Sequence, residues 1–246
     1  MSRRGTLLFG WILALATIAV FASLGRWQSH RAVEKQAMLD AAAAVLHDRR
    51  PKPLALADDP ARLRDYDWAS GLGTFDARGP LLLDNQQRNG RAGVRVYRIF
   101  LPRQSGPLLV DLGWLPLAGD RKLPVIAKPE GEFALSGLLT APPSSGIALG
   151  AGIGREGEGW LLTRVDPAAI ASTTGLSVPL APRVLRLDPA IKLGYERDLE
   201  LLANTLPPQQ HRGYALQWYA LALAVLATAL ILTFRRKRTR PDAANP

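Results

Sequence analysis

Cysteine is absent from the chain, and histidine and methionine are scarce. Without cysteine, the protein can form no disulfide, no covalent haem attachment through a CxxCH motif and no thiol redox centre. Three histidines (His30, His47 and His211) and two methionines argue against a closed zinc site with four protein ligands. No GxSxG nucleophile motif occurs, so a serine hydrolase finds no support.

The formal net charge is +10, which invites a nucleic-acid-binding interpretation. Much of the positive charge, however, flanks two apolar runs, as membrane topology requires. The flanking basic residues are Arg3, Arg4, Arg26, Arg31, Lys35, Arg212 and the Arg235-Arg236-Lys237-Arg238 cluster. We therefore expect a membrane partner and no nucleic acid.

Two uncharged runs are long enough to cross a bilayer as helices. Leu7 to Leu24 has about 18 residues, and Tyr214 to Phe234 has about 21, or about 31 Å of helix. A cleaved signal peptide remains an alternative for the first run, although such peptides have shorter apolar cores. Basic flanks on both termini predict that both termini are cytoplasmic and that the middle segment is periplasmic. An organellar protein would place that segment in the intermembrane space. The sequence thus predicts a multi-pass protein of the cell inner membrane.

The middle segment changes to short apolar stretches separated by turn residues, which is typical of an antiparallel meander. The Asn89-Gly90 pair predicts a hairpin, and Asp166-Pro167 predicts the start of a short helix that stops at Gly175. The predicted strands cover 65–75, 81–87, 93–101, 107–114, 132–140, 160–165 and 184–187. Residues 141–159 are interpreted as a loop.

The predicted fold is an α+β membrane protein: a two-helix transmembrane hairpin with an antiparallel, barrel-like β domain on the periplasmic side. We divide the chain into an N-terminal tail with the first transmembrane helix (1–24), a helix extending from the membrane (25–50), a periplasmic β domain (51–210), a second transmembrane helix (211–234) and a basic cytoplasmic tail (235–246).

Two motifs are set aside. Gly152 to Gly157 reads GxGxxG, but the dinucleotide fingerprint needs a preceding strand and a following helix, and neither is predicted here. Paired carboxylates of a hydrolase are assembled in space, so a periplasmic hydrolase stays open as a minor alternative. The aspartates concerned are interpreted first as turn or strand-end residues: Asp65, Asp67, Asp76, Asp84 and Asp111.

The stretch from His211 to Tyr219 is the strongest candidate for a binding site. The positive end of the helix dipole disfavours imidazolium at His211, and metal ligation requires neutral imidazole. Tyr214 and Trp218 follow at helical spacing, so a flat aromatic ligand could stack between them and Trp27. Arg26 and Arg212 could pair with its carboxylates. The alternative is an ordinary interfacial belt of aromatic and basic side chains. His30 is the second candidate ligand.

Both ends of the middle segment carry motifs that resemble those of a known family. Leu24-Gly25-Arg26-Trp27-Gln28, with Arg31 and Lys35, resembles the LGxWQxxRxxxK signature of the Surfeit locus protein 1 (Shy-type) family. His211, Tyr214, Ala215 and Trp218 resemble its HxxYAxxW signature. Val110 to Pro116 is similar to a further strand motif of the family.

The resemblance implies an assembly factor of haem-copper (cytochrome c) oxidase rather than an enzyme. It implies that the protein binds or hands over haem a while subunit I matures, with His211 as the metal ligand. Taken together with the helical spacing, the expected cofactor-binding residues are His211, Tyr214, Trp218, Trp27, Arg26, Arg212 and Gln28. The resemblance also implies subunit I and other assembly factors as partners. The alternative is a non-haem membrane adaptor that stabilises assembly intermediates.

Overall fold

The computed structural model describes residues 3–117, 123–143, 152–201 and 205–234. The chain divides into two compact units, Met1–Met38 with Thr205–Pro246, and Leu39–Asn204. The predicted basic tail, 235–246, lies outside the described residues, as does the middle of the predicted loop.

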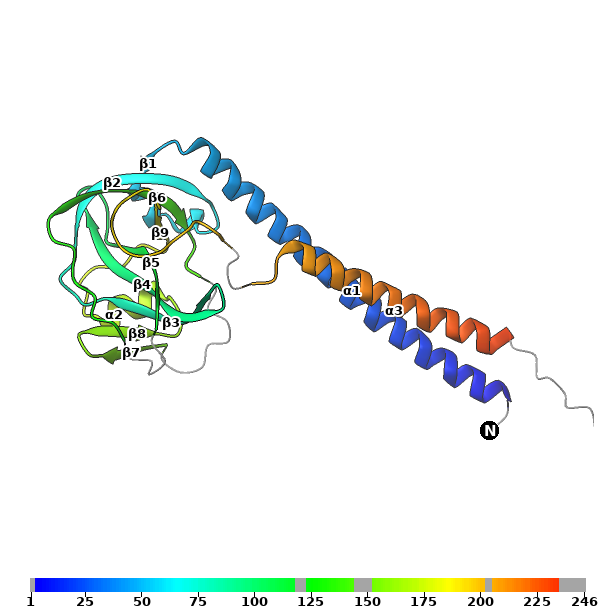
Figure 1. The fold of residues 1–246 in the computed structure, drawn as a ribbon. Coiled ribbons are helices and arrows are strands. Elements are labelled where there is room, and N and C mark those ends of the chain that lie inside the picture. Colours follow the sequence, from blue (N-terminus) through cyan, green and yellow to red (C-terminus); the bar gives the residue numbers. More distant parts are fainter. Residues whose placement is uncertain (1–2, 118–122, 144–151, 202–204, 235–246) are drawn as a thin grey trace, which may run out of the picture. The chain divides into compact units, whose positions relative to one another are not determined.

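Two long helices dominate the first unit (Figure 1). α1 runs without a break over Arg3–Asp48, 46 residues, so the predicted extension of the first apolar helix to about His47 is confirmed. α3 covers Pro208–Phe234 and begins six residues before the predicted apolar run, because Pro208 provides a favourable first helical residue. By length and composition, both helices could cross a membrane.

These helices pack antiparallel along a seam of residues spaced by three and four, a pattern typical of helices in close contact. The Trp11 indole donates to Thr233 Oγ1 at 3.0 Å, and the rings of Phe21 and Trp218 lie 5.5 Å apart. On α1, the buried or half-buried seam residues are Trp11, Ala14, Ile18, Phe21, Gly25, Gln28, Ala32 and Lys35. On α3, they are Pro208, His211, Ala215, Trp218, Ala222 and Val225. We call this surface the helix seam.

The described part of the second unit contains a nine-stranded mixed sheet (Figure 1). Its strands, in chain order, are β1 Lys52–Pro53, β2 Asp67–Phe75, β3 Leu81–Arg88, β4 Arg91–Pro102, β5 Leu108–Pro116, β6 Glu132–Thr140, β7 Ile153–Glu156, β8 Gly159–Leu162 and β9 Val184–Leu187. Their spatial order is β1-β2-β6-β9-β5-β4-β3-β8-β7.

The prediction of an antiparallel, barrel-like sheet is correct only in part. Three pairings are parallel, β1–β2, β3–β8 and β5–β9, because long connections bring these strands alongside each other in the same direction. The sheet curls, and the last residues of β2 also pair with β4. It is nevertheless not a closed barrel, since β3, β8 and β7 continue beyond β4.

Both faces of the sheet are buried. Leu82, Val94 and Val96 belong to one apolar cluster, whereas their neighbours Leu81 and Leu83 belong to a second. The second cluster is covered by α2, Pro167–Thr173, whose Asp166 cap accepts hydrogen bonds from the first helical amides as predicted. Two short 3-10 helices, η1 Leu54–Asp58 and η2 Pro60–Arg62, connect β1 to β2. Burial on both faces explains why the strands lack strict alternation of polar and apolar residues.

The GxGxxG stretch forms part of a β-hairpin. Ile153–Glu156 is β7, which was predicted to be loop, and it pairs antiparallel with β8. Gly157 makes the turn with a φ of 56°. A strand–turn–strand unit presents no helix N-terminus to a phosphate, which confirms that this motif is not a dinucleotide fingerprint.

A buried ion cluster joins the start of β2 to distant segments. The Asp67 carboxylate accepts hydrogen bonds from Lys52 at 2.7 Å, from Arg62 at 2.8 Å and from Arg183 at 2.8 Å. Burial alone would raise the pKa of Asp67, but these hydrogen bonds outweigh burial and hold the pKa below its ordinary value.

This lowered pKa predicts acid sensitivity of the β domain. Asp67 contributes stability above its unfolded-state pKa, about 3.9, and loses it as the pH falls through the lower folded-state value. We therefore expect the free energy of unfolding to be insensitive to this group between pH 6 and 8 and to fall below about pH 4. Hydrogen exchange of β2 amides in the full-length, detergent-solubilised protein checks this. Undiminished protection at pH 3 contradicts it.

Candidate functional site

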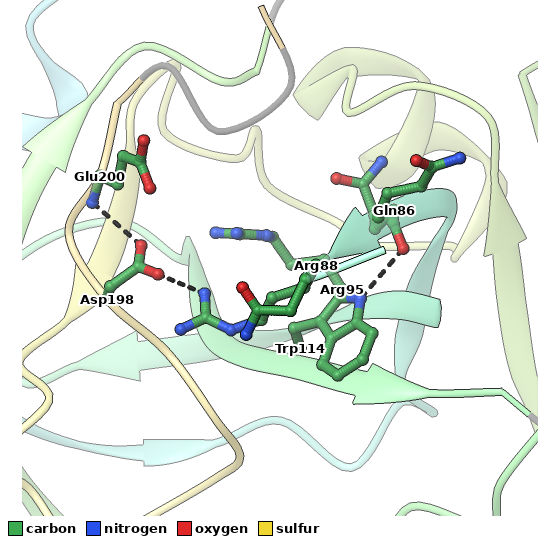
Figure 2. A pocket seen from close by; sticks show the side chains of 8 residues that line it. Gln86, Arg88, Arg95, Trp114, Asp198 and Glu200 are labelled. Atoms are coloured by element: carbon green, nitrogen blue, oxygen red, sulfur yellow. Dashed lines mark hydrogen bonds and ion pairs between the residues drawn. The ribbon is translucent and has the colours of Figure 1, made fainter. Parts of the chain in front are cut away.

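The described residues hold two polar arrangements with features of a site. One lies on the helix seam around His211. The other is a pocket in the β domain, drawn in Figure 2. Each lies wholly within its own unit.

His211 lies in the first turn of α3 and faces α1. Its side chain is buried, with a relative exposure of 6 % for the residue. Its Nδ1 lies 2.6 Å from Oε1 of Gln28 on α1. The other ring nitrogen, Nε2, is also buried and has no hydrogen-bond partner among the described residues. The imidazole therefore has one nitrogen engaged by Gln28 and a second, buried nitrogen without a partner among the described residues.

Lys35 lies on the same seam, seven residues beyond Gln28. It is 8 % exposed, and its ammonium donates to the carbonyl oxygen of Leu206 at 2.8 Å, just before α3 begins. This lysine was quoted as part of the family signature but was not among the predicted site residues. Its spacing from Gly25, Gln28 and Ala32 carries a signal that it faces the second helix.

The other predicted site residues lie largely off the seam. Trp218 is half-buried, with its ring against Phe21. Trp27 and Tyr214 are 54 % and 42 % exposed, and Arg26 and Arg212 are also exposed. The structure therefore brings Gln28 to His211, and it leaves Trp27 and Tyr214 exposed. Ala215, one position after Tyr214, occupies the seam instead. The second candidate ligand, His30, is exposed, and its Nδ1 lies 3.2 Å from Oε1 of Glu34.

The β-domain pocket has a volume of ≈ 230 Å³. Its lining residues are Gln86, Gln87, Arg88, Asn89, Arg95, Trp114, Asp198 and Glu200. Figure 2 shows Arg88 directed toward Asp198, with which it pairs, and the Trp114 indole donating to the Gln86 carbonyl.

The domain itself compensates the charges of three lining residues, Arg88, Arg95 and Asp198. Arg88 also pairs with Glu196 at 2.8 Å, and Arg95 pairs with Asp111 at 2.7 Å. Burial would raise the pKa of Asp198, but the hydrogen bonds from Arg88 and the Glu200 backbone, together with the charges of Arg88 and Arg186, outweigh burial and lower that pKa. These ion pairs therefore connect β3 to the segment after β9 and β4 to β5.

Asp111 also corrects an expectation. It was interpreted as a turn or strand-end residue, but it lies inside β5 and is only 3 % exposed. Its carboxylate is held by Arg95, and its Oδ1 accepts the backbone N–H of Gly113. An arginine on the neighbouring strand made this burial possible, and sequence spacing alone did not reveal that pairing.

A comparison with protein-family models matches residues 15–223 to the SURF1 family. The chain belongs to the SURF1 family. The match covers most of the chain, including the seam residues Gln28 and His211, and it confirms the family inferred from the two terminal motifs. No curated protein sequence matches the chain.

The SURF1 family is linked generally to the assembly of cytochrome oxidase. Two apolar helices are consistent with a membrane-anchored SURF1 protein. The described residues contain no cluster of three or more His, Cys, Asp or Glu that could hold a metal ion.

Proposed function

We propose that this SURF1-family protein is a membrane-anchored assembly factor of cytochrome c oxidase that binds haem a through His211 and hands it to subunit I. The observation that carries the proposal is the unpartnered His211 Nε2, on an imidazole whose Nδ1 is already engaged by Gln28. The role is non-catalytic: the protein binds and releases its cargo.

A single protein ligand suits transfer. One imidazole gives the iron an axial ligand without enclosing the macrocycle, so release requires one bond to break. The lipid-like cargo would contact exposed apolar side chains on both helices, such as Trp27, Tyr214 and Leu216. These side chains lie close to the helix turn that carries His211. These exposed aromatics are also suited to the membrane interface.

The burial of Nε2 favours a second candidate function. As the structure stands, neighbouring side chains enclose this nitrogen, so iron would reach it only if the helix seam opened. A non-haem adaptor, which holds oxidase assembly intermediates together through its domain and helices, needs no such opening.

The absorption spectrum of the protein, purified from a host that makes haem a, separates the two functions. Soret and alpha bands of haem a in the full-length protein support haem handling. A haem-free protein whose deletion still blocks oxidase assembly supports the adaptor. Normal oxidase assembly after deletion excludes both.

We further propose that the protein lies in the inner membrane with both termini cytoplasmic and the β domain periplasmic. Basic residues 235–238 directly follow α3, and such residues favour the cytoplasmic side. A reporter that is active only in the cytoplasm is therefore expected to be active when it is fused after Pro246, and a reporter that is active only in the periplasm is expected to be inactive there. A reporter inserted after Gly90, at the tip of the β3–β4 hairpin, serves as the control and should give the periplasmic result. Equal signals at both sites contradict a two-span topology.

A further inference from the structure

We propose that Gln28 is a positioning residue for His211. It fixes the imidazole in the tautomer that carries its proton on Nδ1 and leaves the lone pair on Nε2. The consequence for haem rests on the proposed function, but the tautomer itself does not.

The first step is the direction of the hydrogen bond. Nδ1 lies 2.6 Å from the carbonyl oxygen of the Gln28 side chain. With the amide oriented in this way its oxygen accepts, so Nδ1 donates and carries the proton. In neutral imidazole the second nitrogen is then an acceptor.

The opposite arrangement fits less well. If the Gln28 amide were turned, its NH₂ group would donate to Nδ1, and Nε2 would carry the proton. That proton would point into a buried place with no partner among the described residues. A buried donor without a partner is rarer and costs more than a buried acceptor without one. The arrangement with Nδ1–H is therefore favoured.

The helix seam explains why glutamine suits this position. Gly25 and Ala32 lie one turn on either side of Gln28, and Ala215 lies one turn beyond His211. Small residues let the two helices approach closely, which brings the amide within hydrogen-bonding distance. Glutamine is also uncharged, so it supplies an acceptor without burying a further charge in the seam.

For a metal-binding histidine, this arrangement has a direct consequence. A hydrogen bond at the other ring nitrogen orients the imidazole and raises its basicity, and losing that bond commonly costs about 10–100-fold in affinity. Gln28 would thus act on the iron through His211, without contacting the iron itself.

The test reads the tautomer directly. The chain has three histidines, and replacing His30 and His47 with glutamine leaves His211 as the single ¹⁵N-labelled imidazole in the full-length, haem-free protein. In detergent micelles at alkaline pH, ¹⁵N NMR is expected to show a protonated Nδ1 and an unprotonated Nε2. A protonated Nε2 in this protein overturns the proposal without any further variant.

Three variants then test the role of the amide. Gln28→Leu is expected to lose the single tautomer, and Gln28→Glu to keep it, because a carboxylate also accepts from Nδ1. Gln217→Leu, at an exposed glutamine on α3, is the matched control and should keep the wild-type spectrum. An unchanged tautomer in Gln28→Leu overturns the assignment.

Haem a titration of the same proteins gives the consequence. Gln28→Leu is expected to bind about 10–100-fold more weakly than wild type, with Gln28→Glu near wild type. If the tautomer behaves as expected but no variant or wild type binds haem a, the positioning role stands and the proposed haem function fails.

Discussion

Asp67→Ala is expected to lower the free energy of unfolding of the β domain by about 3–5 kcal/mol. The reason is the guanidinium left behind. The side chains of Asp67 and Arg183 are both 0 % exposed, and Arg183 Nη1 lies 2.8 Å from Asp67 Oδ2. Without the carboxylate, Arg183 remains a buried cation whose other partners among the described residues are backbone carbonyl oxygens. Removing one partner of a buried ion pair destabilises a protein far more than replacing both partners with apolar side chains.

A matched surface pair separates this effect from general loss of charge. Arg103 and Glu132 form an ion pair whose side chains are 64 % and 37 % exposed, and Glu132→Ala should cost no more than about 1 kcal/mol. Lys52 and Arg62, which also bind Asp67, are partly exposed and can turn to solvent. Urea unfolding of the full-length protein, followed by tryptophan fluorescence, to which the buried Trp68 contributes, measures both variants.

A double variant makes the cause explicit. Asp67→Leu with Arg183→Met removes both charges and replaces them with apolar groups, so it is expected to be more stable than Asp67→Ala. Equal losses in the single and double variants would show that packing, not the uncompensated Arg183 charge, dominates at this position.

Local signals in the sequence predicted most of the elements. The strand at 184–187 and the strand at 132–140 match β9 and β6, because each is a short apolar run bounded by turn residues. Asp166-Pro167 predicted α2 through cap chemistry that acts within one turn. Asn89-Gly90 also predicted a hairpin. In the structure these two residues alone form the turn between β3 and β4, and both have a positive φ, 51° for Asn89 and 73° for Gly90.

Features that depend on distant segments were not predictable in this way. The parallel pairing of β5 with β9 joins strands separated by most of the domain's second half. The strand β7 is hidden in a glycine-rich stretch because its partner, β8, supplies most of the apolar residues. The burial of Asp111 depends on Arg95 across the sheet. Local periodicity carries none of this information.

The site shows the same division. Helical spacing predicted that Tyr214 and Trp218 share a helix face with His211. A helix face is about 100° wide, however, so spacing alone does not determine which of its residues contact a second helix. The observed seam follows His211, Ala215 and Trp218, and it leaves Tyr214 exposed. Gln28 was included among the predicted site residues through the family motif, yet its contact with His211 became visible only when the two helices were placed together.

His211→Ala is expected to abolish haem a binding by the full-length protein. The loss of affinity should be at least as large as the loss of about 10–100-fold that is typical when a residue supporting a metal ligand is removed. The substitution removes the nitrogen that would hold the iron. It also removes the partner of Gln28 and leaves that amide in the seam without its hydrogen bond, so folding must be checked independently. The contact between Phe21 and Trp218 lies two turns away on the same seam. An unchanged emission spectrum of the six tryptophans, which include Trp218, would show that His211→Ala leaves their environments intact.

The other two histidines provide the controls. His30 and His47 are both exposed on α1, and replacing either with alanine removes an imidazole of the same chemistry from the same protein. Haem a bands should survive in His30→Ala and His47→Ala and disappear in His211→Ala. Exogenous imidazole should restore part of the bands in His211→Ala, because the small side chain leaves room for the missing ring. Haem a bands that persist in His211→Ala without imidazole would show that another residue binds the iron. That result would contradict the proposal that His211 is the single exchangeable ligand.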